Sequence, residues 1–122
     1  METRQDAPRT VVFGLCGSFC SFSAVLPQNE TLCRRGWRVV PVLSASAAGQ
    51  DTRFGTAAAL KQTLRQITGQ EPLTTLQQVE PLGPKKLAQA MVIAPCTGTT
   101  LGLLAAGISS TAVTLALSLI HI

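Results

Sequence analysis

The segment that decides the predicted fold is residues 91–100, MVIAPCTGTT. Its four apolar residues at 91–94 predict a short buried strand. The strand stops at Pro95, and hydroxylated residues and Gly98 then lead into an apolar run that predicts a helix over 99–106. A buried strand, a small polar turn and a helix in succession are typical of a parallel sheet that binds ligands at its carboxyl edge.

Two further strands are predicted upstream, at 10–15 (TVVFGL) and 37–43 (WRVVPVL), because both segments are apolar and rich in β-branched residues. Pro41 indicates a backbone position that is not fully paired, or a bulge. A glycine–serine turn over 16–23 separates the first strand from a helix. We expect that helix to begin near Leu26, since a proline follows at 27, and to end at a glycine.

After the second strand, the sequence predicts a loop over 44–55, a helix over 56–67 closed by Gly69, and a short strand over 75–79. Strands that alternate with helices in this order predict an α/β protein with a parallel sheet and flanking helices. At 122 residues, the chain is long enough for one domain.

Composition excludes several classes of function. The ten Lys and Arg residues give a net charge of +4, but they are scattered and only five aromatic residues accompany them, so a nucleic-acid interface is not predicted. The charge supports at most a preference for anionic small molecules. Residues 87–122 contain no Lys, Arg, Asp or Glu, but Pro95 and several glycines interrupt them, so we expect buried elements and not a membrane helix.

The four cysteines lack the spacing of a zinc site, and no metal is expected. We interpret them as reduced thiols of a cytoplasmic protein, with Cys16, Cys20 and Cys96 packed as small core residues.

Small polar turns follow all three strands: Gly17-Ser18, Ser44-Ala45-Ser46 and 97–100. Backbone N–H groups and hydroxyls at a helix start bind phosphate well, so these turns predict a site for a phosphate-bearing ligand. The alternative is that the Ser and Thr residues only cap helices. The sequence lacks the GxGxxG fingerprint and the acidic residue at the end of the second strand that dinucleotide binding needs. It also lacks the GxxxxGK[ST] loop of NTP-binding proteins, so a mononucleotide such as FMN fits better.

The segment VIAPCTGTTLGLLAAGISS resembles the flavin-loop motif APxTxNTxxKxxxG of the homo-oligomeric flavin-containing Cys decarboxylases. Several segments are more closely similar to the family of dipicolinate synthase B subunits, in register over about residues 10–116. These segments are GLCGSFCSF, AVLPQ, DTRFG, ITG, EPLGP and MVIAPCTG. Thr99, Leu103 and Ser110 depart from the superfamily, which often has Asn, Lys and an acidic residue at these positions.

The resemblance implies a Rossmann-like, flavodoxin-like fold that is incomplete at its C-terminus. It also implies a role in the oxidation of dihydrodipicolinate to dipicolinate in the mother cell during sporulation. The partner would be the A subunit of dipicolinate synthase, which binds NAD(P), and the chain would form a homo-oligomer. FMN would be the cofactor. The residues that this implies for the cofactor site are Gly17, Ser18, Ser44, Pro95, Thr97, Gly98 and Thr100. The catalytic residues are not identified.

Two alternatives stay open: a flavin-dependent decarboxylase of the same superfamily, and a non-catalytic subunit that keeps the fold. Decarboxylases of this type use a histidine after the second strand, whereas the single histidine here is His121. A dicarboxylate substrate would need a cation, and Arg53 is the first candidate, followed by Lys85 and Lys86. Asp51 is expected to cap or turn its loop and not to act as a base.

The ending LSLIHI resembles the conceptual translation of a sequencing-transposon end. We therefore expect a loose terminus at 1–9, a truncated domain at 10–116 and an artefactual tail at 117–122. A truncated chain of this kind is expected to be inactive alone. It would leave the sheet open beside the 91–94 strand and residues 115–122 without their natural cover.

Overall fold

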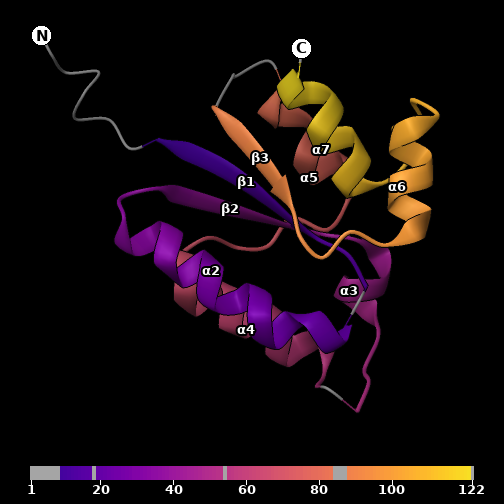
Figure 1. Ribbon diagram of the computed structural model, residues 1–122. Coiled ribbons are helices and arrows are strands. Elements are labelled where there is room, and N and C mark those ends of the chain that lie inside the picture. Colours follow the sequence, from indigo (N-terminus) through magenta and orange to yellow (C-terminus); the bar gives the residue numbers. More distant parts are fainter. Residues whose placement is uncertain (1–8, 18, 54, 84–87, 122) are drawn as a thin grey trace, which may run out of the picture.

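A computed structural model describes residues 9–17, 19–53, 55–83 and 88–121, with the side chains of these residues up to position 120. Three parallel strands, β1 (Thr10–Leu15), β2 (Arg38–Leu43) and β3 (Ala90–Ile93), form a sheet in the order β2-β1-β3 (Figure 1). The parallel α/β class is confirmed. The bounds of β1 are those predicted, and β2 and β3 each begin one residue away from the prediction.

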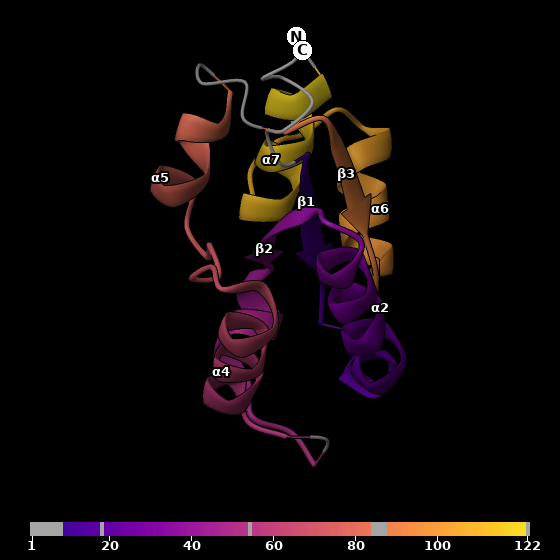
Figure 2. The same ribbon diagram turned by 90° about the vertical axis from the view of Figure 1, so that its left-hand side faces the viewer.

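Helices cover both faces of the sheet, as Figures 1 and 2 show. On one face lie α2 (Phe22–Arg34) and α4 (Ala57–Thr68), and on the other lie α5 (Leu76–Val79) and α7 (Ala112–His121). The remaining elements are η1 (Phe19–Ser21), α3 (Ala45–Gly49), η2 (Glu80–Leu82) and α6 (Gly98–Ala105). None of the helices in the described part of the chain is long and apolar enough to cross a membrane.

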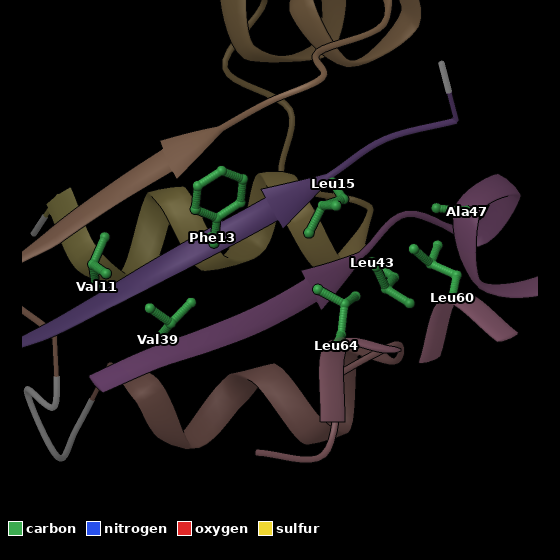
Figure 3. Packing of buried hydrophobic residues seen from close by; sticks show 8 residues of the cluster. All are labelled: Val11, Phe13, Leu15, Val39, Leu43, Ala47, Leu60 and Leu64. Carbon is green, nitrogen blue, oxygen red and sulfur yellow. The ribbon is translucent and has the colours of Figure 1, made fainter. Parts of the chain in front are cut away.

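The apolar side chains of the sheet divide between two clusters, one on each face, because successive residues of a strand point to opposite sides. Val11, Phe13 and Leu15 of β1 join Val39, Leu43, Ala47, Leu60 and Leu64 on the side of α2 and α4 (Figure 3). Val12 and Cys16 join Val42, Val79, Leu82, Ala112, Val113 and Ala116 on the side of α7. The central strand therefore contributes to both halves of the core.

Pro41 lies in a regular strand and not at a bulge, since it pairs in register with Phe13. Its carbonyl accepts a hydrogen bond from Leu73 N at 2.9 Å, and Leu43 N donates to Leu73 O at 2.8 Å. In a strand of a parallel sheet, the N–H and C=O positions of one residue point to the same side. The nitrogen of Pro41 therefore lies on the side of its carbonyl, away from β1. The missing N–H therefore faces the outer edge of β2, where proline is tolerated.

The predicted start of the first helix was wrong. α2 begins at Phe22 and continues through Pro27, which is exposed. The hydrogen bond that Pro27 cannot donate would go to the carbonyl of Ser23, an exposed residue that water can reach. The predicted end is confirmed: Gly36 has φ 92°, and Trp37 N donates to Leu32 O at 3.1 Å in a Schellman cap.

The strand predicted over 75–79 is instead helix α5. Thr75 caps it by accepting a hydrogen bond from Gln78 N, and the Gln78 side chain accepts one from Thr75 N, which together make a capping box. The loop predicted over 44–55 likewise contains α3. The helix with its closing Gly69, at φ 70°, is confirmed as α4 within one residue.

Residues 115–120, which we expect to lack the cover that a longer chain would give, still pack on the core of this one. Leu115, Leu119 and Ile120 of α7 pack against the second cluster, and Val113 and Ala116 are fully buried there. β3 does lie at the edge of the described sheet, as expected, and Val92 on it is 40% exposed. The domain boundaries stay a prediction.

Candidate functional site

Backbone hydrogen bonds join the three turns that follow the strands. Ser44 N donates to Leu15 O at 3.0 Å, which ties the end of β2 to the end of β1. Cys16 N donates to Pro95 O at 3.0 Å, which ties the end of β1 to the turn after β3. We call the residues at this edge the strand-end rim: Gly17, Ser44, Ser46, Pro95, Thr97, Gly98 and Thr100. The described residues of the predicted cofactor site thus lie at one edge of the sheet.

Gly17 and α3 make the closest approach within the rim. A Cβ atom added to Gly17 would lie 2.7 Å from Cβ of Ser46, a distance that real side chains do not adopt. Glycine at position 17 is therefore what lets the turn after β1 lie against the first turn of α3. Ser18, the next predicted residue, lies outside the described part of the chain.

Two rim hydroxyls are helix caps, as the alternative interpretation proposed. Ser44 Oγ accepts a hydrogen bond from Ala47 N at 3.2 Å at the start of α3. Thr97 Oγ1 accepts one from Thr100 N at 3.3 Å at the start of α6. Capping uses a lone pair of each oxygen and leaves the hydrogen of Ser44 for a ligand, whereas the hydrogen of Thr97 is donated to Thr100 Oγ1. The cofactor role of these residues stays a prediction.

Thr100 is buried and contacts residues from the turn after β1 and the turn after β3. It is only 6% exposed, and its Oγ1 lies 3.2 Å from Cys16 Sγ and accepts a hydrogen bond from Thr97 Oγ1 at 3.3 Å. These contacts hold the first turn of α6 against the end of β1. Pro95 follows a cis peptide bond after Ala94.

Gly98, the first residue of α6, faces open space, because a Cβ added there would meet no atom within 4 Å. The start of this eight-residue helix presents backbone N–H groups and the positive end of the helix dipole. The described rim residues include no carboxylate, so nothing on the rim itself repels an anion. Its donors and its open space therefore fit the phosphate of a mononucleotide.

Of the proposed substrate cations, the structure describes Arg53, which is not part of this rim. Arg53 is exposed in the turn between Thr52 and Gly55, which is closed by Thr52 N donating to Gly55 O at 2.9 Å. Lys85 and Lys86 lie outside the described residues. Asp51 has the expected structural role, since its Oδ1 accepts a hydrogen bond from Ala57 N at 2.8 Å at the start of α4.

The cysteine prediction was right for Cys16, which is fully buried, and wrong for Cys20 and Cys96, which are exposed. Partial burial raises the pKa of the Cys96 thiol, and the neighbouring Cys16 raises it further. Both effects disfavour the thiolate, so Cys96 is not an activated nucleophile. Among the described residues, no three His, Cys, Asp or Glu side chains gather into a group that could bind a metal.

The sequence did not predict a pocket of about 150 Å³ between η1, α2, α3 and α4. Its walls include Phe19, Phe22, Leu26 and Leu60. Phe22 and Leu26 have helical spacing in the sequence. The pocket could not be predicted from this spacing, because its other walls come from distant parts of the chain. No residue of the predicted cofactor site lines this pocket. One wall residue, Ala47, does donate a backbone hydrogen bond to Ser44 Oγ of that site.

Comparison with known proteins agrees with this fold. The profile of the family described as Flavoprotein matches residues 1–121. The dipicolinate synthase B subunit of Bacillus subtilis (strain 168) is 38% identical over 108 residues, which are 88% of this chain and 54% of that protein. The chain therefore spans about half the length of this relative.

Solved structures give the same result. The crystal structure of the dipicolinate synthase B subunit from Bacillus halodurans superposes with a TM-score of 0.80 at 33% identity, covering 93% of this chain and 58% of that one. The FMN-dependent cysteine decarboxylase SpaF gives 0.67 at 27% identity, covering 88% and 61%. A PPC decarboxylase mutant, at 18% identity and a TM-score of 0.61, shares the fold, with 90% of this chain and 59% of that one covered. The chain belongs to the Flavoprotein family.

Proposed function

We propose that this chain binds FMN at the strand-end rim and acts as the B subunit of a dipicolinate synthase. The observation that carries the proposal is the convergence of three small polar turns at one edge of the sheet, through the Ser44–Leu15 and Cys16–Pro95 backbone bonds. The 38% identity to the B. subtilis protein supports the choice of enzyme. In this role the chain takes part in the oxidation of dihydrodipicolinate to dipicolinate during sporulation, in the mother-cell cytoplasm.

The phosphate of FMN would bind in front of α6, against the backbone N–H groups that begin at Gly98, with the Ser44 hydroxyl as a further donor. Gly17 would let the backbone of the first turn approach the nucleotide. Bound flavin supplies hydride and electron transfer. The residues of the chain would bind and orient it, and Thr97 and Thr100 would hold α6 in place for that purpose.

The remaining parts of the reaction belong to an assembly. We propose that NAD(P) binds to the partner, the A subunit of the synthase, and that this chain also forms a homo-oligomer. Arg53, with its planar pair of donors, would bind one carboxylate of the substrate. Arg53 lies on the turn beside the pocket wall formed by Thr52 and Gly55, at the α3–α4 side of the sheet.

A flavin-dependent decarboxylase is the second candidate, favoured by the likeness to SpaF at 27% identity. A histidine after β2, on which such decarboxylases depend, is missing here, since the only histidine of the chain is His121. A protein that keeps the fold without binding flavin is the third. FMN binding separates the third candidate from the first two.

The binding test uses a substitution in the open space before α6. Gly98→Asp places a carboxylate where the phosphate would bind, and an acidic residue in the first turn of a helix does not weaken the fold. Gly102→Asp, one turn later in α6 and also facing open space, is the matched control with the same change of charge. Quenching of FMN fluorescence should saturate with the parent chain, weaken at least tenfold with Gly98→Asp, and change little with Gly102→Asp.

Equal FMN binding by both variants would remove the rim as the phosphate site, and no binding by the parent chain would favour the third candidate. The enzymatic role needs a separate test, in which the complete B subunit containing this sequence is co-expressed with its A-subunit partner. Dipicolinate formation is followed by its ultraviolet absorbance. No product with both proteins present would contradict the synthase assignment, whatever the chain does with FMN.

A further inference from the structure

We propose that the pocket between η1, α2, α3 and α4 is a second binding site, which takes a small, uncharged, ring-sized apolar molecule. It is separate from the strand-end rim, and the proposal holds whether or not the rim binds FMN. Phe19, Phe22, Leu26 and Leu60 give the pocket an apolar lining. The rings of Phe19 and Phe22 meet edge to face, with centroids 5.4 Å apart, so they form one aromatic wall.

The volume suits a single small ring system. The pocket measures about 150 Å³, below the range of about 300–1,000 Å³ that is usual for drug-sized ligands. A cavity of about 150 Å³ lined by Leu, Ile and Phe side chains is known to bind benzene. A benzene- or indole-sized molecule therefore matches this space, whereas an FMN ring system with its ribityl phosphate exceeds it.

The space results from small residues at positions where larger apolar ones would fill it. Ala47, Ala57 and Ala59, from α3 and α4, all lie on the walls, together with Gly55. The pocket opens to solvent, since Gln50, Gly55, Thr56 and Ala59 on its walls are exposed. Two helices and a turn thus present their smallest side chains to one space that a ligand can reach from outside.

The described residues that line the pocket include no charged side chain, so none of them pairs with an anion. The polar residues of the pocket, Gln50, Thr52, Thr56 and Thr63, are all neutral. Two residues of opposite charge flank the pocket without lining it: Asp51, whose Oδ1 lies 2.8 Å from the nitrogen of the wall residue Ala57, and Arg53. The Gln50 amide and the Thr63 hydroxyl offer hydrogen-bond partners for one polar atom of the ligand, such as an indole N–H.

The walls are fixed before any ligand arrives. The turn that carries Thr52 and Gly55 is closed by two backbone hydrogen bonds between them, of 2.9 and 3.0 Å. Thr56 Oγ1 accepts from Ala59 N at 3.0 Å, which fixes the first turn of α4. A preformed pocket binds with little cost for ordering its residues.

The test uses indole as the neutral probe and benzoate as a ring-sized anion, with calorimetry and saturation-transfer NMR on the 122-residue chain. Thr63→Trp should fill the pocket, because Thr63 lines it and is half-buried, whereas Gln62→Trp places the same side chain at an exposed position of α4 that does not line it. Ala59→Phe is the second filling variant, in case the larger one does not fold, as judged by circular dichroism.

We expect saturable indole binding by the parent chain and by Gln62→Trp, a loss of at least tenfold in affinity in a folded filling variant, and benzoate binding at least tenfold weaker than that of indole. Unchanged indole affinity in the folded filling variants would overturn the pocket as the site. Benzoate binding as tight as indole would overturn the neutral class, and no saturable indole binding would overturn both.

Discussion

The contact between Gly17 and α3 leads to the sharpest prediction, because the substitution Gly17→Ala adds a single methyl group at a known place. That Cβ would lie 2.7 Å from Cβ of Ser46, and ordinary contacts begin at 3.4 Å. The turn after β1 and α3 would therefore have to separate by about 0.7 Å, and side-chain rotation cannot relieve the contact because both atoms are Cβ atoms. Overpacking of this kind costs about 1–3 kcal/mol.

The prediction is a loss of about 1–3 kcal/mol in the free energy of unfolding, measured by urea denaturation with an unchanged m-value. Gly98→Ala is the matched control, since a Cβ there meets nothing within 4 Å, and it should be neutral or stabilising by up to about 1 kcal/mol.

The double variant Gly17→Ala/Ser46→Gly tests the stated cause. Removing Cβ of Ser46 removes the atom that the new methyl group meets, although a glycine inside α3 itself costs about 0.5–1 kcal/mol. We expect a favourable coupling energy of about 1 kcal/mol or more between the two substitutions. A Gly17→Ala variant as stable as the parent, or an additive double variant, would refute the close packing of the two turns.

Three further substitutions or measurements test other parts of the structure. Thr97→Ala removes the cap of α6 and its bond to Thr100, and should cost about 1 kcal/mol in urea denaturation, while Thr99→Ala, an exposed residue of the same turn, should cost little. Leu64→Ala removes most of a fully buried side chain of α4 and should lower the free energy of unfolding by about 2–5 kcal/mol; a smaller loss would mean that α4 is not packed on the sheet. Because desolvation and the neighbouring Cys16 raise the pKa of Cys96, its alkylation by iodoacetamide should have a higher pH midpoint in the folded chain than in an unfolded peptide of the same sequence, followed by peptide mass spectrometry; an equal or lower midpoint in the folded chain would contradict both effects.

The strands could be predicted because local patterns determine them. The apolar runs at β1, β2 and β3 have no competing periodicity, and Gly36 and Gly69 end their helices through a positive φ that glycine adopts without strain. Proline was overestimated as a helix breaker at position 27, because its cost depends on whether water replaces the lost hydrogen bond. That depends on exposure, which is a property of the folded chain.

α5 could have been found from the sequence and was missed. Thr75 followed three residues later by Gln78 is the signature of a capping box, and the spacing of three between Leu76 and Val79 is that of a helix and not of a strand. The position of α7 could not have been found in this way, since its cover comes from Gly83 and η2, which pack on Leu119 from 36 residues away or more in the chain. The pocket between α2 and α4 has the same origin, as its walls come from segments that meet only in the folded protein.

The candidate site shows why hydroxyl-bearing turns are ambiguous in a sequence and less so in a structure. Thr97 Oγ1 both accepts from Thr100 N and donates to Thr100 Oγ1, so its hydrogen is already used inside the turn. Ser44 Oγ accepts from Ala47 N, and the hydrogen of that hydroxyl is the one that could point to an anion. The two caps are therefore not equivalent. At the start of α6, a phosphate would depend on backbone N–H groups, and substitution of Thr97 should affect stability more than affinity. Ser44→Ala should affect both, because the same oxygen that caps α3 would also serve the ligand.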